Sequence, residues 1–92
     1  MRLNKRPIQF YYIRKNDDNF LLHGVAVGQS RNLSPTPIFK APRSFEWARR
    51  FSTVENAIKC ATESHITGVS VIDRFGHVLC TITNDGEVRR GA

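Results

Sequence analysis

Aromatic rings and positive charges are interleaved in three stretches of this sequence, and they are its clearest chemical signal. The stretches are 10–15 (FYYIRK), 39–43 (FKAPR) and 45–51 (FEWARRF). Single-stranded nucleic acid is bound by this combination, because bases stack on rings while cations follow the phosphates. Trp, Tyr and Arg also predominate among the residues that stabilise protein interfaces, so a protein partner fits the same stretches. The structural alternative is that most of the rings belong to the core.

Positive charge is concentrated in the first half of the chain. Residues 1–50 carry ten Lys or Arg and three Asp or Glu, whereas residues 51–92 carry four and five. The charge balance is therefore +7 in the first half and −1 in the second, within a net charge of +6. This segregation predicts an anionic partner, either RNA, alone or in a ribonucleoprotein, or an acidic protein surface.

We expect the partner to meet one continuous basic surface. The residues predicted to form it are Lys5, Arg6, Arg14, Lys15, Arg31, Lys40, Arg43, Trp47, Arg49 and Arg50. Arg predominates over Lys here, and its planar guanidinium is suited to bidentate contact with phosphate or carboxylate. Among the rings, Phe10, Phe20 and Phe51 are expected in the core, and those predicted to be exposed are Tyr11, Phe39 and Trp47.

No pattern in the sequence is typical of a catalytic, metal or nucleotide-loop site. The candidate side chains are His23, His65, His77, Cys60 and Cys80. Their spacing matches no zinc-ligand motif, and the glycines form no phosphate-binding pattern. The acidic candidates, Asp85 among them, fall in predicted turns, where Asp is common. We expect no enzyme, no metal and no cofactor, with a small ribonuclease that uses the histidines as the less favoured alternative.

The elements that position these residues begin with a predicted β-hairpin over residues 8–27. Residues 8–15 are β-branched and aromatic, residues 16–19 (NDDN) favour a turn, and residues 20–27 form the returning strand. Both faces of the first strand carry apolar side chains, so we expect one in the core and the other partly covered. Three prolines within residues 28–44 predict a long loop.

A helix is predicted over residues 53–66. Ser52 and Glu55 match a capping box, in which two side chains satisfy each other's backbone amides. The apolar residues that follow at helical spacing are Val54, Ala57, Ile58 and Ala61. Gly68 is a natural stop for this helix. Residues 45–51, just before it, fit either a strand or a short helix, and we prefer the strand because the next segment has its own start signal.

A second hairpin and a short tail complete the chain. Residues 69–72 and 77–83 flank a turn at 73–76 (DRFG). Residues 1–7 and 87–92 are expected to be flexible ends. The element order β-β-(β)-α-β-β predicts one domain over residues 1–92, an α+β two-layer sandwich. In it one amphipathic helix covers an antiparallel sheet of four to five strands.

Length and composition favour a small cytoplasmic protein. The chain has 92 residues, of which 40% are hydrophobic, and splitting it would leave two halves too short for separate cores. We find neither a signal peptide nor an apolar run of the roughly 18 residues that a membrane helix needs. We therefore expect no membrane partner and no small-molecule substrate.

The layout from Ile8 to Thr83 resembles that of small phage-encoded inhibitor proteins. The anti-CRISPR proteins that block type I RNA-guided surveillance complexes are the closest in character. The resemblance lies in the short chain, the single helix on an antiparallel sheet, the lack of an active-site motif and the strongly charged surface. It implies a binding protein that docks where guide RNA and protein are both exposed, so that target DNA is obstructed. Acidic members of this group mimic DNA, which a basic chain does not.

Overall fold

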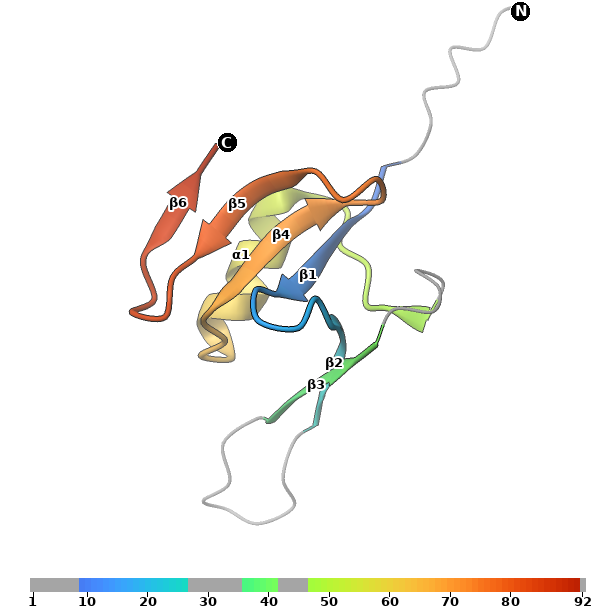
Figure 1. Cartoon of the computed structure of the whole chain (residues 1–92), viewed down its shortest axis with the longest axis horizontal. Coiled ribbons are helices and arrows are strands. Elements are labelled where there is room, and N and C mark those ends of the chain that lie inside the picture. The colour runs from blue at the N-terminus through green and yellow to red at the C-terminus, as the bar shows by residue number, and fades with distance from the viewer. Residues whose placement is uncertain (1–8, 27–35, 42–46, 92) are drawn as a thin grey trace, which may run out of the picture.

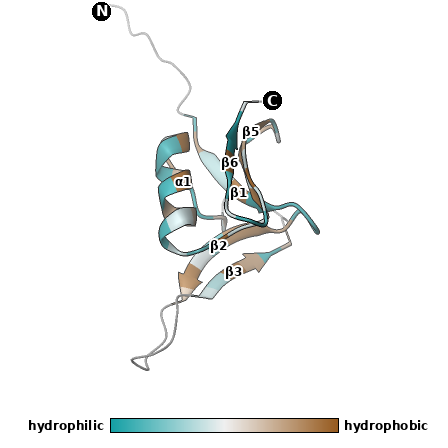
Figure 2. Cartoon of the chain, turned by 90° about the vertical axis from the view of Figure 1, so that its left-hand side faces the viewer, coloured by the Kyte–Doolittle hydropathy of each residue, from teal (hydrophilic) through white to brown (hydrophobic). Residues whose placement is uncertain are grey.

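The computed structural model describes residues 9–26, 36–41 and 47–91, and within these ranges it contains six strands and one helix. The strands before the helix are β1 (Tyr11–Lys15), β2 (Leu21–Ala26) and β3 (Thr36–Lys40). The helix is α1 (Val54–Glu63), and the strands after it are β4 (Val69–Asp73), β5 (Val78–Ile82) and β6 (Val88–Arg90). All strands join one antiparallel sheet in the order β3-β2-β1-β4-β5-β6 (Figure 1). The α+β architecture is as predicted, with one helix on one side of the sheet (Figure 2).

Both edge strands lie in segments that the sequence predicts to be irregular, which is why the sheet has six strands rather than four to five. β3 lies inside the predicted loop 28–44, where Thr36–Lys40 pairs with β2. Pro37 is tolerated there because an edge strand can spare one backbone donor. β6 lies inside the predicted flexible end 87–92 and pairs with β5. Both predictions are wrong at these strands, since edge pairing compensates for weak local propensity. The other predicted flexible end, 1–7, is outside the described residues.

Residues 49–51 fill a gap between β1 and β2 instead of forming the predicted strand. The two strands pair at Arg14 and Leu21 and separate toward the start of β1. There the amide of Arg49 donates to the carbonyl of Leu22 (2.9 Å), and Phe51 exchanges two hydrogen bonds of 2.9 Å with Tyr11. In the described part of the predicted strand, 47–51, the Phe51 bridge is the only β-pairing. Its first two residues, 45 and 46, lie outside the described residues.

The helix is confirmed, with its cap shifted by one residue and with an earlier end. Thr53, rather than Ser52, caps it by accepting a hydrogen bond from the amide of Asn56 (3.0 Å). Ser52 instead accepts from the side-chain amide of Asn56 (3.1 Å). The chain leaves the helix at Ser64 and His65. His65 takes the left-handed conformation at the helix end (φ 56°), and Gly68, the predicted stop, is also left-handed (φ 69°).

The core has a layer on each face of the sheet. On the helix side, Ala57 and Ala61 are fully buried, and their small side chains allow α1 to approach the sheet closely. The sheet residues under them are Ile13, Leu22, Val69, Val71, Cys80 and Ile82. On the other face Ala48 packs with three buried sheet residues, Tyr12, Leu21 and Ile72. The second face of β1 is thus partly covered, as predicted.

Candidate functional site

A groove of about 550 Å³ lies where residues 49–52 enter the helix. Its walls are formed by Phe10, Arg49, Arg50, Phe51, Ser52, Asn56, Lys59, Cys60 and Glu63. The groove thus brings together three cations, two aromatic rings, several hydrogen-bonding groups and one carboxylate. This composition suits a ligand that has both negative charge and flat, apolar surface.

The backbone pairing described above fixes one wall of the groove. Phe51 is only 6% exposed, and its bridge to Tyr11 anchors the segment that carries both arginines. The guanidinium of Arg49 lies 5.4 Å from the centroid of the Phe51 ring. The guanidinium of Arg50 lies 4.5 Å from the centroid of the Phe10 ring. Both distances are typical of cation–π contacts, which orient a guanidinium while leaving its N–H edge available.

The helix supplies the opposite wall. Asn56, Lys59, Cys60 and Glu63 are spaced at i, i+3, i+4 and i+7, so they share one side of α1. The Thr53 cap sets where the helix begins and therefore which side of it meets the arginines. Lys59 adds an exposed ammonium group to the two guanidinium groups across the groove.

The groove cations differ in their ion pairing from Lys15 and from the two arginines of β6. Among the described residues, no carboxylate forms an ion pair with Arg49, Arg50 or Lys59. The three cations that do form ion pairs with carboxylates are Lys15, Arg89 and Arg90, whose partners are Asp18, Glu87 and Glu55. Glu63 is the one carboxylate among the described lining residues, and it forms no ion pair with these cations, so the groove keeps an excess of positive charge and an anionic ligand can bind there without breaking an ion pair.

The structure places the predicted contact residues in more than one location. Arg49 and Arg50 line the groove, and Trp47, two residues earlier, is 74% exposed. Arg14 and Lys40 are both paired with Leu21, which places them on the face away from the helix. The described cations therefore do not form one continuous surface, because alternate residues of a strand point to opposite faces. Four predicted residues lie outside the described residues: Lys5, Arg6, Arg31 and Arg43.

Lys15, another predicted contact residue, already has partners within the chain. It forms an ion pair with Asp18 at 3.6 Å, and its ammonium lies 5.5 Å from the centroid of the Phe39 ring. By contrast, the Nε atom of Arg14 is buried and has no hydrogen-bond partner among the described residues.

The rings are distributed partly as predicted. Trp47 is exposed and Phe51 is buried, as expected. Tyr11 and Phe39 were expected to be exposed, but both are partly buried against the helix-side core. Phe39 pairs with Leu22 across the strands, so its ring points to the same face as this core residue. Phe10 is only partly buried; it packs against the core cluster on the face away from the helix and also lines the groove.

Among the aromatic and cationic residues of the groove, sequence reasoning missed three, Phe10, Phe51 and Lys59. The two phenylalanines were assigned to the core alone, and Lys59 lies in the half of the chain with little net charge. A signal for Lys59 was present, since it shares the polar side of the predicted helix with Asn56 and Glu63. Only the long-range bridge between Tyr11 and Phe51 places this side of the helix opposite the two arginines.

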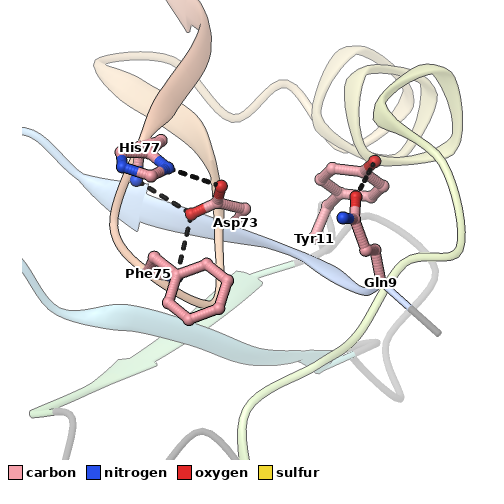
Figure 3. A network of polar contacts seen from close by, with 5 residues as sticks. All are labelled: Gln9, Tyr11, Asp73, Phe75 and His77. Carbon is pink, nitrogen blue, oxygen red and sulfur yellow. Dashed lines mark hydrogen bonds and ion pairs between the residues drawn. The ribbon is translucent and has the colours of Figure 1, made fainter. Parts of the chain in front are cut away.

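His77 has a structural role in the turn between β4 and β5 (Figure 3). Its ring nitrogen Nδ1 and its backbone amide both contact the carboxylate of Asp73 at 2.9 Å. Burial alone would raise the pKa of Asp73, but hydrogen bonds from the amide and ring of His77 and from the amide of Phe75 hold this pKa below its ordinary value of 3.8. The contacts fix the turn.

A second hollow, of about 330 Å³, lies at the other end of the helix. It is lined by Ala61, Thr62, His65, Ile66, Thr67, Ile82, Asp85 and Gly86. It contains no Lys or Arg, and its one charged residue, Asp85, is acidic. An anionic ligand therefore favours the first groove over this hollow.

No group of three or more His, Cys, Asp or Glu side chains in the described residues could hold a metal ion. In the same part of the chain, no helix has the length and apolar character needed to span a membrane. Comparisons with models of protein families, with curated proteins and with solved structures found no match.

Proposed function

We propose that this protein binds single-stranded RNA, alone or as part of a ribonucleoprotein, through the groove between residues 49–52 and α1. One observation supports the proposal above all others. Three cations without ion-pair partners among the described residues, Arg49, Arg50 and Lys59, share a groove of about 550 Å³ with two phenylalanine rings.

The arrangement assigns a separate task to each part of the groove. Arg49 and Arg50 are held against rings, so their N–H edges are oriented before a phosphate arrives, which reduces the entropy lost on binding. Lys59 contributes a mobile point charge from the facing wall. The exposed ring of Trp47, close to both arginines in the chain, offers a surface on which a base can stack.

We propose that the protein binds RNA and does not cleave it. The ring of His77 is held by Asp73 in a turn, and His65 occupies the left-handed position that ends the helix. Each thus has a structural explanation. The side chains that line the groove include no histidine.

A narrower form of the proposal follows from the resemblance to phage inhibitors. In this form the RNA is the guide of an RNA-guided CRISPR surveillance complex in the host cytoplasm, and the bound protein blocks target DNA. The test adds the protein to a purified type I complex and measures binding of labelled target DNA. Loss of DNA binding with the native chain, and its recovery with Arg49→Glu/Arg50→Glu, is expected. Undiminished DNA binding at saturating protein would rule out the narrower form.

The general form is tested by titrating the protein with fluorescent single-stranded RNA and DNA at low salt. We expect saturable binding of the native chain and a loss of at least about 100-fold in affinity for Arg49→Glu/Arg50→Glu, because two cations become two anions beside the phosphates. Circular dichroism checks that the variant still folds. An acidic protein as partner is the other outcome. In that case neither nucleic acid binds, an acidic peptide does, and the proposal is wrong.

A further inference from the structure

A third pair of arginine and phenylalanine lies at the same end of the sheet as the groove. Phe75, in the turn between β4 and β5, is 71% exposed. The guanidinium of Arg74 lies 5.2 Å from the centroid of its ring. The pair repeats the cation–π arrangement of the two pairs in the groove.

The pairing of β1 places this turn close to the groove. Tyr11 is paired with Phe51 on one side and with Asp73 on the other. The bridge to Phe51 holds the groove, and Asp73 is the last residue before Arg74. The groove and the turn therefore flank the start of β1, two strand spacings or about 10 Å apart.

The turn is built so that Phe75 stays exposed. The carboxylate of Asp73 accepts hydrogen bonds from the amides of Phe75 (2.8 Å) and His77 (2.9 Å), and its other oxygen contacts the His77 ring (Figure 3). Gly76 takes the left-handed conformation (φ 88°) that completes the turn. In this turn the Phe75 ring stays largely exposed, and its centroid lies 6.2 Å from that of the His77 ring. The exposed ring gains little from burial, and it is accessible to a ligand.

Arg74 is available to an anion. The nearest carboxylate along the chain, that of Asp73, is occupied by the turn amides and by His77. No ion pair involves Arg74 among the residues that the structure describes. The turn thus offers one uncompensated cation and one exposed ring.

We propose that Arg74 and Phe75 form a second subsite for the RNA strand that occupies the groove. This inference rests on the proposed function and extends it, because it assigns the direction in which the strand leaves the groove. The strand crosses the end of the sheet past the start of β1, one phosphate contacts Arg74, and one base stacks on Phe75. The distance of about 10 Å corresponds to about three phosphates of a stacked strand.

The test compares short and long RNA. Oligouridylates of about 4 and about 12 nucleotides are titrated by fluorescence anisotropy, since the short strand fills the groove and the long one reaches the turn. The variants are Phe75→Ala and Arg74→Gln. The matched controls are Phe75→Tyr, which keeps a ring, and Arg89→Gln, which removes an exposed arginine from the far edge of the sheet.

Phe75→Ala is expected to weaken binding of the long strand about 10-fold, because one stacked base is lost, and to leave the short strand unchanged. Arg74→Gln is expected to lower the salt dependence of long-strand binding by about 0.7 in log–log slope, because one phosphate contact is lost. Both controls should bind as the native chain does. Native affinity of Phe75→Ala for the long strand overturns the subsite and leaves the groove intact. Equal weakening of both lengths also overturns it. If the native chain binds neither length, the proposed function itself is wrong.

Discussion

Arginines in two regions of this protein have opposite surroundings. In the groove, Arg49 and Arg50 lie over phenylalanine rings, and among the described residues neither is ion-paired. At the C-terminal edge, Arg89 and Arg90 of β6 donate to Glu87 at 2.6 Å and to Glu55 at 3.0 Å. The same side chain is thus an available cation in one region and a neutralised one in the other. The two regions therefore differ in the partners of their arginines and not in the number of arginines, which is two in each.

Removing a ring should have the largest effect where the groove meets the core. Phe51 is buried and carries the bridge to Tyr11, whereas Phe75 is exposed. We expect Phe51→Ala to lower the free energy of unfolding by about 3–5 kcal/mol and Phe75→Ala by less than about 0.5 kcal/mol. Urea denaturation followed by circular dichroism measures both. Equal losses would mean that the turn ring also supports the fold.

Charge reversal distinguishes the arginines of the groove from those of the C-terminal edge. Arg49→Glu/Arg50→Glu is expected to lower RNA affinity by at least about 100-fold, which is about 2.7 kcal/mol. The matched variant Arg89→Glu/Arg90→Glu makes the same change in net charge at the C-terminal edge. We expect it to lower affinity by less than about 5-fold, through long-range repulsion alone. Similar losses in the two variants would show that net charge, rather than the groove, governs binding.

The Asp73 turn should show a distinct dependence on pH. The folded state lowers the pKa of Asp73, so ionised Asp73 stabilises the protein above the unfolded pKa. This contribution is lost as the pH falls below about 4 and through the lowered pKa. At pH 7 we expect Asp73→Asn to reduce the free energy of unfolding by about 1 kcal/mol.

The pH dependence is checked by urea denaturation of both proteins across the acid range. The difference in stability between the native chain and Asp73→Asn should shrink as the pH falls. A difference that stays constant below pH 4 would show that the carboxylate charge does not stabilise the turn. Phe75 would then be less firmly held than the hydrogen bonds indicate.

The smallest change in RNA affinity is expected when the arginines of the C-terminal edge lose their ion-pair partners. Glu55→Gln/Glu87→Gln removes both carboxylates that neutralise them. We expect RNA affinity to rise by about 2- to 3-fold, because exposed ion pairs contribute only a few tenths of a kcal/mol each. The rise is measured by the same anisotropy titration at low salt. Unchanged affinity would show that ion pairing is not what keeps this edge from contributing to binding.

The local elements could be predicted from the sequence, whereas the groove could not. The start of α1 to within one residue, its apolar spacing and the Asp73 turn are encoded within a few residues, so the sequence alone indicates them. β3 and β6 form because they pair with neighbouring strands, which local propensity does not report. The groove depends on the β-bridge between Tyr11 and Phe51. The neutralisation of Arg90 at the C-terminal edge depends on its hydrogen-bonded ion pair with Glu55, which is 35 residues away in the sequence.

The predicted contact residues lie close together in the structure where the prediction drew on neighbours in the chain. Trp47, Arg49 and Arg50 belong to one aromatic and basic stretch, and the structure places both arginines in the groove and leaves Trp47 exposed. Arg14 and Lys40 were grouped with them by charge, but the strand pleat turns those two to the face away from the helix.

The salt dependence of RNA binding tests the central claim most directly. The native chain and Arg49→Glu/Arg50→Glu are titrated with the long oligouridylate over a series of salt concentrations. Contacts from Arg49, Arg50, Lys59 and Arg74 predict a log–log slope of about −3 for the native chain, at about −0.7 for each phosphate. The slope should become markedly shallower in the variant. Absence of binding at the lowest salt, or equal slopes for the two proteins, would contradict the account.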